Sequence, residues 1–457
     1  MFIECGNLHA RIVRATDDER TWLREYLSFE DTRAKFAKKR YGSGDGRVRM
    51  FDIFTGTFPT GLLPLVRKAG PMEGFQIDLL DSRKKPCEPD WTVDLKWLRD
   101  YQLAAVRNAV AFGRGIISAP TGSGKTELAI ALHQVLSCRW LFLVHRTTLV
   151  EQAAERFTLR TGQTADIIGE GRWENTGATF TCASFQSIYS ALKRKDPRVL
   201  VLLQQIQGLL VDEVHVLPSD TYWRVSMTTQ QAYYRFGLSG TPLARGDRRS
   251  LLAIASTGPI IYRIQPDVLI EAGVLAKPRI QLVPVAQLST CKTWQGVYGE
   301  CIVRSRTRNQ TIVDCAKRAE KPCLVFVKEI QHGRLLTERL LKADLRAEFV
   351  FGADSTPERQ AATRRLVRGD LDVLVSSVIF QEGVDIPQLR SVVIANGGRS
   401  VIAALQRIGR GMRVTADKNT FQVWDVADHG CKLLERHTKA RVRAYTSQGY
   451  ETVEAML

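Results

Sequence analysis

Residues 115–132 constrain the fold of this chain more than any other segment, because three patterns follow one another there without a break. Residues 115–118 form an apolar, strand-like run, residues 119–126 read Ala-Pro-Thr-Gly-Ser-Gly-Lys-Thr, and residues 127–132 are helix-forming. A strand, a glycine-rich turn and a helix N-terminus in this order make a phosphate-binding loop, where backbone N–H groups and the helix dipole face an anion. The segment predicts that the chain binds a nucleoside triphosphate.

The polar positions of this loop have separate chemical roles. Gly122 and Gly124 let backbone N–H groups turn inward around a polyphosphate. Lys125 can reach the β- and γ-phosphates, and the Thr126 hydroxyl can ligate Mg²⁺. The predicted nucleotide-binding residues of the loop also include Thr121 and Ser123. We therefore expect ATP and Mg²⁺ as cofactors.

A second part of an ATP site follows further along the chain. Residues 209–211 are an apolar run that ends in the paired carboxylates Asp212 and Glu213. An aspartate at a strand end can hold the Mg²⁺ shell, and a neighbouring glutamate can polarise the attacking water. Asp212 is the predicted metal ligand and Glu213 the predicted catalytic base.

Three arginines near the C-terminus are spaced at helical intervals. Arg407, Arg410 and Arg413 stand at i, i+3 and i+6, so on a helix they lie roughly on one side. An arginine brought to a γ-phosphate stabilises the charge of the transition state. The alternative is a solvated basic helix face.

Apolar runs alternate with helical patterns over two long stretches, which predicts an α/β fold with parallel sheets and crossover helices. The first stretch has strand-like runs at 140–144, 180–183, 209–211 and 236–238, and the second at 323–327, 349–351, 373–376 and 391–395. The predicted boundaries are 1–80 for a small α+β accessory domain that binds DNA, 81–94 for a linker, 95–257 for a first, ATP-binding lobe, 258–284 for a proline-containing connector and 285–457 for a second lobe.

Charge and composition narrow the classes of partner. The formal net charge of +17 suits a polyanionic partner such as nucleic acid, although many proteins are basic without one. No apolar run is long enough to span a bilayer and the N-terminus lacks signal-peptide regions, so we expect no membrane partner and a cytoplasmic location. Nine cysteines without a C-x-x-C pair predict reduced thiols rather than zinc or disulfides.

Several segments in order along residues 95–457 resemble the motifs of superfamily 2 helicases. They are residues 98–102, which resemble the adenine-reading segment, 119–126 (motif I), 144–149 (motif Ia), 183–187 (a strand-contacting motif), 212–215 (a DExH box), 239–242 (motif III), 324–327 (motif IV), 375–387 (motif V) and 406–413 (motif VI).

This resemblance implies two tandem RecA-like parallel-sheet lobes that clamp ATP. The first lobe would supply the phosphate loop and the DExH box, and the second lobe would supply Gln406, Arg410 and Arg413 for catalysis. Gln102 would contact the adenine and Asp385 the ribose. The expected nucleic-acid contacts are Arg146, Ser184, Ser376 and Ser377, and the residues expected to couple ATP and DNA binding are His215, Ser239, Thr241 and Arg407.

One branch of the superfamily resembles the chain most. The Leu-Arg-x-Tyr-Gln opening and the DExH box are similar to the group that includes XPB, RecG and the UvsW-type phage recombination helicases. A DEAD-box RNA helicase would have Ala-Asp where this chain has Val214 and His215. The compact length resembles the UvsW type, which unwinds, reanneals and branch-migrates forked or branched DNA. That implies a role in recombination, repair or replication.

The expected function is therefore that of an ATP-dependent DNA helicase that works as a monomer. Replication or recombination proteins are possible partners, and the expected location is the host cytosol if a phage encodes the protein. Three alternatives stay open: a duplex DNA translocase that serves a nuclease, an RNA helicase, because phosphate contacts do not exclude RNA, and a scaffold that binds ATP without multiple turnover. In the accessory domain, a basic group is either a duplex-binding patch or a solvated helix face; it comprises Lys35, Lys38, Lys39 and Arg40.

Overall fold

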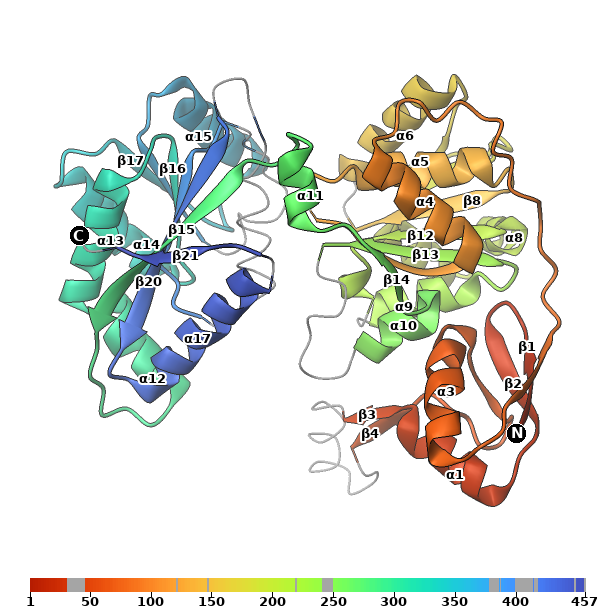
Figure 1. Ribbon diagram of the computed structural model, residues 1–457. Coiled ribbons are helices and arrows are strands. Elements are labelled where there is room, and N and C mark those ends of the chain that lie inside the picture. Colours follow the sequence, from red (N-terminus) through yellow and green to blue (C-terminus); the bar gives the residue numbers. More distant parts are fainter. Residues whose placement is uncertain are drawn as a thin grey trace. The chain divides into compact units, whose positions relative to one another are not determined.

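The computed structural model describes residues 1–30, 46–120, 122–145, 148–217, 220–240, 250–377, 386, 388–398, 414, 418–447 and 449–455. The chain forms two compact units, Met1–Ile264 and Gln265–Leu457, and each is described by itself (Figure 1). Several expected functional residues lie outside the described residues: Thr121, Arg146, Thr241, Asp385, Gln406, Arg407, Arg410 and Arg413, together with Lys35, Lys38, Lys39 and Arg40. Their roles stay predictions.

The accessory domain is an α+β unit at the N-terminus, residues 1–81. Its sheet has the order β5-β2-β1-β6, in which β2 is antiparallel to β1 and β6 is parallel to it. The first helix begins with a capping box, in which the Thr16 hydroxyl accepts from the Glu19 N–H and the Glu19 carboxylate accepts from the Thr16 N–H. The elements are β1 (Phe2–Cys5), β2 (His9–Arg14), α1 (Asp17–Tyr26), β3 (Ser28–Glu30), β4 (Arg47–Arg49), β5 (Thr57–Pro59), α3 (Leu63–Ala69) and β6 (Asp78–Asp81).

The first lobe is built on a sheet with the order β10-β9-β11-β8-β12-β13-β7-β14. In its described part β10 is antiparallel to β9, and the other pairs are parallel. The strands are β7 (Arg114–Ser118), β8 (Trp140–Val144), β9 (Asp166–Gly169), β10 (Arg172–Trp173), β11 (Phe180–Ser184), β12 (Gly208–Asp212), β13 (Tyr234–Ser239) and β14 (Ile260–Arg263).

Helices cover both faces of this sheet (Figure 1). One face carries α4 (Asp100–Phe112), α5 (Lys125–Val135) and α6 (Thr148–Thr161), and the other carries α7 (Phe185–Lys193), α8 (Pro197–Gln205), α9 (Asp220–Thr228) and α10 (Ser250–Thr257). Strands β7, β8 and β11 are buried along their whole length, and β8 (Trp-Leu-Phe-Leu-Val) is an unbroken apolar run rather than an alternating pattern, as expected for a strand covered on both faces.

The second lobe has a sheet with the order β17-β18-β16-β19-β20-β15-β21, and the described pairs are parallel. Its strands are β15 (Lys277–Ala286), β16 (Cys323–Phe326), β17 (Ala347–Val350), β18 (Val373–Ser376), β19 (Ser391–Ile394), β20 (Thr420–His429) and β21 (Thr452–Glu454). Its helices are α11 (Pro266–Glu271), α12 (Trp294–Val297), α13 (Arg306–Arg318), α14 (Ile330–Leu341), α15 (Thr356–Arg368) and α17 (Lys432–Thr446).

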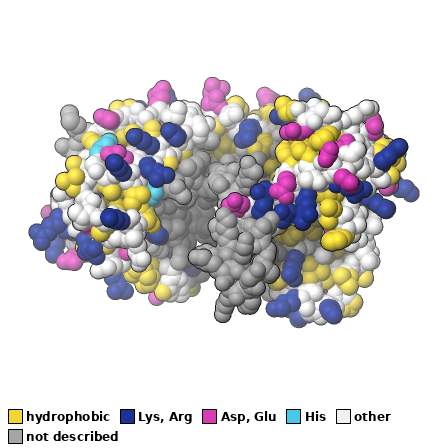
Figure 2. Space-filling model, turned by 90° about the horizontal axis from the view of Figure 1, so that it is seen from below, with side chains coloured by type: hydrophobic (Ala, Val, Ile, Leu, Met, Phe, Trp, Pro, Cys, Tyr) yellow, Lys and Arg dark blue, Asp and Glu magenta, His cyan; other side chains and the backbone are white. Residues whose placement is uncertain are grey.

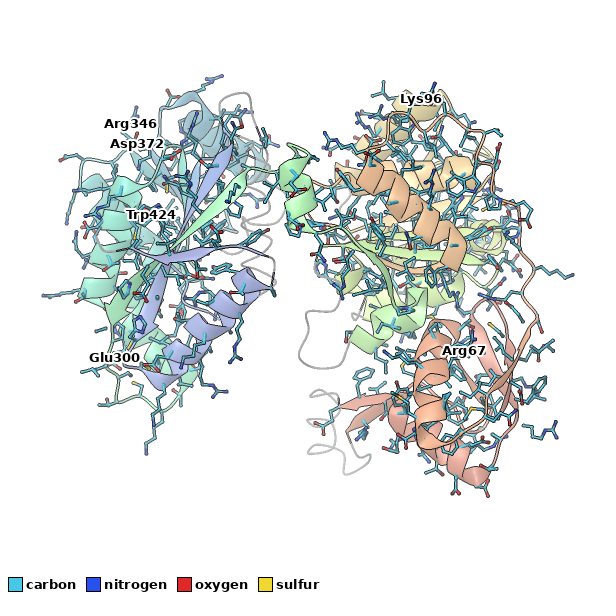
Figure 3. The ribbon with its side chains drawn as sticks, in the orientation of Figure 1. Arg67, Lys96, Glu300, Arg346, Asp372 and Trp424 are labelled. Atoms are coloured by element: carbon cyan, nitrogen blue, oxygen red, sulfur yellow. The ribbon has the colours of Figure 1, made fainter. Side chains whose placement is uncertain are left out.

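Ion pairs form both at the surface and in the core of the second lobe. Arg346 and Asp372 lie side by side just before β17 and β18, with 2.7 Å between Arg346 Nη2 and Asp372 Oδ1 (Figure 3). Deeper in the lobe, the buried guanidinium of Arg441 on α17 lies 2.9 Å from Asp425 Oδ2 on β20. Removing one partner of such a buried pair would leave the other charge buried without a counter-charge, which is strongly destabilising, so this contact holds α17 on the sheet.

The predicted α/β class with tandem parallel-sheet lobes is confirmed, whereas the expected connector has a different structure. Residues 258–284 include β14, which pairs with β7 in the first sheet, and most of β15, which pairs with β20 in the second. The prolines there suggested irregular chain, because proline lacks the N–H that a central strand uses. Pro278 and Pro284 flank the stretch of β15 that pairs with β21, so their missing N–H groups interrupt no described bond to that strand.

The accessory domain packs directly on the first lobe. An apolar cluster joins its core to Ile254 and Ala255 of α10. The backbone oxygen of Asn7 accepts from Arg114 Nη2 at 2.8 Å. A Cβ atom added to Gly61 would lie only 2.1 Å from the Ile254 oxygen, so the two backbones approach as closely as glycine permits. The domain is therefore anchored on the lobe by more than the chain between them.

Acid should destabilise the first lobe through His133 on α5. Burial lowers the pKa of His133 to about 4, and its ring packs edge-on against Phe157 and Phe180. Because the folded pKa lies below the unfolded value, the unfolded state binds the extra proton and stability falls as the pH drops from about 6.5 to about 4. Between pH 7 and pH 5 the parent should lose about 2 kcal/mol of unfolding free energy that His133→Gln does not lose, in urea unfolding at both pH values. Equal losses would rule out His133 as the cause.

Among the helices that the structure describes, none combines the length and the hydropathy that a membrane span needs.

Candidate nucleotide-binding site

The glycine-rich loop joins the end of β7 to the start of α5, as the sequence pattern predicts. Gly122 and Gly124 have φ angles of +87° and +83°, a region that side-chain-bearing residues rarely adopt. Gly124 precedes Lys125, the first residue of α5, so the N-terminus of this helix lies at the loop. The positive end of the helix dipole favours an anion at this place.

Gln102 on α4 braces this loop from behind. Its Nε2 donates to the Ser123 backbone oxygen at 2.9 Å, and its Oε1 accepts from the Arg99 N–H at 3.0 Å. The Tyr101 hydroxyl donates to the same Ser123 oxygen at 3.3 Å. A Cβ atom on Gly124 would lie 2.3 Å from Gln102 Nε2, so this contact also requires a glycine. The expected contact between Gln102 and an adenine stays a prediction.

Four of the predicted residues meet at one edge of the sheet. Lys125 Nζ lies 2.8 Å from Glu213 Oε1. The other carboxylate oxygen, Oε2, lies 3.2 Å from His215 Nδ1 and 3.3 Å from the Ser239 hydroxyl. His215 Nδ1 and Ser239 Oγ are themselves 2.9 Å apart. Strands β7, β13 and β12 are neighbours and parallel, so their carboxyl ends bring these segments together, which is where α/β proteins bind ligands. We call these four residues the Lys125 cluster.

The two carboxylates differ in charge state. Burial raises the pKa of Asp212 to about 6, although Lys125 opposes that shift. Burial acts in the same direction on Glu213, but the Lys125 ammonium and the hydrogen bond with His215 outweigh it and hold its pKa well below the usual range. Glu213 is therefore ionised at neutral pH, whereas burial disfavours the charged form of Asp212.

The backbone of Glu213 is strained. Its φ of +51° and ψ of +53° lie in the left-handed region, which costs a non-glycine residue roughly 1–3 kcal/mol. The hydrogen bonds of its side chain hold it in this conformation at the end of β12. Strained backbone conformations of this kind are concentrated at functional sites, where they hold a side chain in the orientation that the function requires.

The residues present fit Mg²⁺ and a triphosphate. Asp212 Oδ1 and Ser123 Oγ are buried and have no hydrogen-bond partner among the described residues, which leaves them free for a ligand. In the same described ranges no group of three or more His, Cys, Asp or Glu residues is placed to hold a metal by itself. Mg²⁺ commonly takes one or two carboxylates and completes its shell with water and substrate phosphates. Asp212 and Thr126 are the candidates for that shell.

The structure adds a network that sequence reasoning missed. Glu127, on the first turn of α5, accepts hydrogen bonds from Arg156 and Arg160 of α6, the latter at 3.0 Å from Arg160 Nε to Glu127 Oε2. The Arg160 guanidinium lies over the ring of Trp97, 4.7 Å from its centroid. The network ties the helix behind the phosphate loop to α6. The i, i+4 spacing of Arg156 and Arg160 was visible in the sequence, but their shared partner was not.

The expected nucleic-acid contacts that the structure describes are serines at strand ends. Ser184 ends β11 and caps α7, accepting from the Ser187 N–H at 3.1 Å. Ser376 ends β18, and its hydroxyl donates to the Ser377 oxygen at 3.1 Å. The Ser377 hydroxyl is buried and has no partner among the described residues. The capping bond explains Ser184 without a ligand, so a phosphate contact at these serines stays a prediction.

Known proteins resemble both lobes. Residues 95–244 match the family described as Type III restriction enzyme, res subunit, and residues 307–415 match the helicase conserved C-terminal domain. Together the two matches span more than half of the chain.

Two curated relatives illustrate the likeness along the chain. A candidate helicase of the Sulfolobus islandicus filamentous virus is 29% identical over 72% of this chain, and the chain spans 64% of that protein, less than two thirds of its length. The ATP-dependent DNA helicase uvsW of Enterobacteria phage T4 is 26% identical over 94% of this chain and 91% of the phage protein.

A solved structure shows a similar fold. It is a fragment of a candidate HsdR subunit of a type I restriction enzyme from Vibrio vulnificus YJ016, 22% identical, with a TM-score of 0.62 over 92% of this chain and 81% of that one. The likeness covers both lobes and is a likeness of fold alone.

Proposed function

The chain is a superfamily 2 helicase that resembles UvsW, and from this premise we propose that it is an ATP-driven motor that unwinds, reanneals or branch-migrates forked and branched DNA. The observation that carries the proposal is the Lys125 cluster, in which the Lys125 ammonium, the Glu213 carboxylate and the side chains of His215 and Ser239 meet at one sheet edge. The relatives that match both lobes are named as DNA helicases and translocases, which supports DNA as the substrate.

The proposed roles follow from the positions of the side chains. The loop glycines and Lys125 would hold the triphosphate, and Asp212 with Thr126 would hold Mg²⁺. The bound metal would polarise the phosphoryl oxygens and neutralise charge. Glu213 would take the proton of the attacking water, because its carboxylate is ionised and stands beside Lys125.

The ion pair between Lys125 and Glu213 suggests how ATP binding would make Glu213 a better general base. In the structure the Lys125 ammonium is the strongest counter-charge of Glu213. When Lys125 turns to a phosphate, Glu213 loses much of that counter-charge and its pKa rises towards the range of a useful base. Ser239 and His215 hold the other carboxylate oxygen and keep it aimed. These two residues are the proposed sensors through which the state of the phosphates would reach the rest of the lobe.

DNA binding would rest on charge rather than on base reading. The chain has 65 Lys and Arg residues against 48 Asp and Glu, and Lys and Arg side chains are spread over both units on the face shown in Figure 2. Contacts with backbone phosphates fix register without reading sequence, and each one makes affinity more sensitive to salt. We propose low sequence preference, action as a monomer in the cytosol, and replication or recombination proteins as candidate partners.

A duplex DNA translocase is the second candidate function, and the match of residues 95–244 to a restriction-enzyme subunit favours it. Such a motor moves along duplex DNA without separating its strands and serves a nuclease partner. The two functions share the ATP site, so they are distinguished only by whether ATP hydrolysis separates DNA strands or moves the protein along intact duplex DNA.

ATPase and strand-displacement assays with single-stranded, duplex, forked and four-way DNA, and with RNA, test the proposal. A branched-DNA helicase should hydrolyse ATP fastest with forked or four-way DNA and should separate or migrate their strands. Raising salt from 50 to 200 mM should weaken binding by about 10³-fold if about six phosphates are contacted. Stimulation by duplex DNA without strand separation would favour the translocase, and stimulation by RNA alone the RNA helicase. A lack of multiple turnover with every nucleic acid would remove the motor function.

A further inference from the structure

The accessory domain presents a bare aromatic side chain at the tip of a tight turn. Residues 52–56 connect the chain after β4 to β5, and the Phe54 side chain at the tip is 96% exposed. Phe51 and Phe58, on either side of the turn, are 3% and 0% exposed and pack edge-to-face with centroids 6.5 Å apart. The domain therefore has an aromatic core directly beneath the turn, and Phe54 points away from it.

The turn is rigidly built. The Asp52 N–H donates to the Thr57 oxygen, and the Gly56 N–H donates to the Asp52 oxygen, both at 2.9 Å. The Asp52 carboxylate oxygen Oδ1 accepts from the N–H groups of Phe54 and Thr55 at 2.9 and 3.3 Å. These bonds lower the pKa of Asp52 and keep it ionised. The backbone that carries Phe54 is thus organised before any ligand arrives, which reduces the entropy lost on binding.

Arginines lie on the two elements next to the turn, β2 and α1. The Gly56 oxygen accepts from the Ile12 N–H of β2 at 2.8 Å, and β2 exposes Arg11 and Arg14. Arg20 of α1 reaches to within 3.8 Å of the position that a Cβ on Gly56 would take. An exposed aromatic ring among arginines is the combination that binds nucleic acid by stacking on bases while cations meet the phosphates.

The small exposed apolar surface of this turn favours a nucleic-acid base over a protein as its partner. Beside Phe54, only Ile53 in this turn is an exposed apolar residue, at 39%. A stable protein interface needs about 800 Å² on each partner, far more than two side chains provide. One aromatic ring does match one unpaired base, whose flat face offers a stacking surface of the same size.

We propose that Phe54 stacks on an unpaired base at the branch point of a DNA substrate and so gives the protein its preference for forked over blunt duplex DNA. The proposal rests on the proposed function, because a motor that did not act on DNA would have no such base to meet. It assigns a substrate-selecting role to the accessory domain, remote from the Lys125 cluster. Stacking needs an aromatic ring, and leucine or alanine cannot replace it.

Binding measurements with Phe54→Ala, Phe54→Leu and Phe54→Trp test the proposal. Phe54→Ala and Phe54→Leu should bind forked DNA about 10–100-fold more weakly than the parent and blunt duplex equally well. Phe54→Trp should retain the parental preference. Phe112→Ala is the matched control, because Phe112 is also an exposed phenylalanine, at 61%, but lies at the end of α4 in the first lobe. ATPase activity without DNA should be unchanged in all four variants.

A fluorescent adenine analogue at the branch point gives a direct signal. The parent and Phe112→Ala should change its emission on binding, whereas Phe54→Ala should not. The stacking role would be wrong if Phe54→Ala bound forked DNA like the parent, or if it weakened binding to forked and blunt DNA alike. If the parent itself were not stimulated by any DNA, the proposed function would fail, and that result is seen without any variant.

Discussion

Glu213→Gln should reduce DNA-stimulated ATP hydrolysis by about 10²–10⁴-fold while ATP binds at least as tightly as in the parent. Glutamine has the same shape as glutamate but cannot take a proton from water. It also removes the anion that lies 2.8 Å from Lys125, so the ammonium is freer to meet a phosphate. Single-turnover hydrolysis and binding of a fluorescent ATP analogue separate the two effects.

The control for this prediction has to change charge without touching the site. Glu151→Gln makes the same change on α6 of the same lobe, where Glu151 pairs with Arg172 at the surface. It should leave turnover near the parental rate, since surface ion pairs contribute little. Parental turnover in Glu213→Gln would show that another group takes the proton. A loss of ATP binding together with turnover would instead show that Glu213 supports the loop structurally.

Most of this site could be predicted because its parts are local in sequence. The glycine-rich loop, its lysine and the paired carboxylates each follow an apolar strand, and parallel strands place their carboxyl ends at one edge. The pairing of Lys125 with Glu213 follows from that topology once β12 and β7 are known to flank β13. Spacing alone could not show it, because the two residues are far apart along the chain.

The contacts missed by sequence reasoning depend on tertiary packing. Glu127 and Arg160 come together because α5 and α6 lie on the same face of the sheet, and no local pattern states which helices share a face. The docking of the accessory domain depends on the close approach of Gly61 to the backbone of Ile254. A glycine permits such an approach, but its presence in the sequence does not predict which segment it will contact. In β15, prolines that argue against a strand are tolerated because they lie outside the stretch paired with β21.

Arg410→Ala should reduce turnover by about 10³–10⁵-fold and change ATP affinity far less. The spacing of Arg407, Arg410 and Arg413 and the resemblance to helicase motif VI imply that Arg410 acts on the γ-phosphate. An arginine placed there meets charge that develops mainly in the transition state, so its loss lowers the maximal rate more than binding. Steady-state and single-turnover kinetics with saturating DNA measure the split.

Two further variants decide between this role and a plain basic surface. Arg410→Lys keeps the charge but loses the planar fork of donors, so it should restore little of the rate if Arg410 contacts the phosphoryl group. Arg368→Ala removes an exposed arginine at the end of α15 and should leave turnover unchanged. If Arg410→Ala lowered ATP affinity and turnover in proportion, the residue would bind nucleotide or support folding rather than the transition state. If its effect matched that of Arg368→Ala, the arginines would be a solvated helix face, and hydrolysis would depend on the first lobe without an arginine from the second.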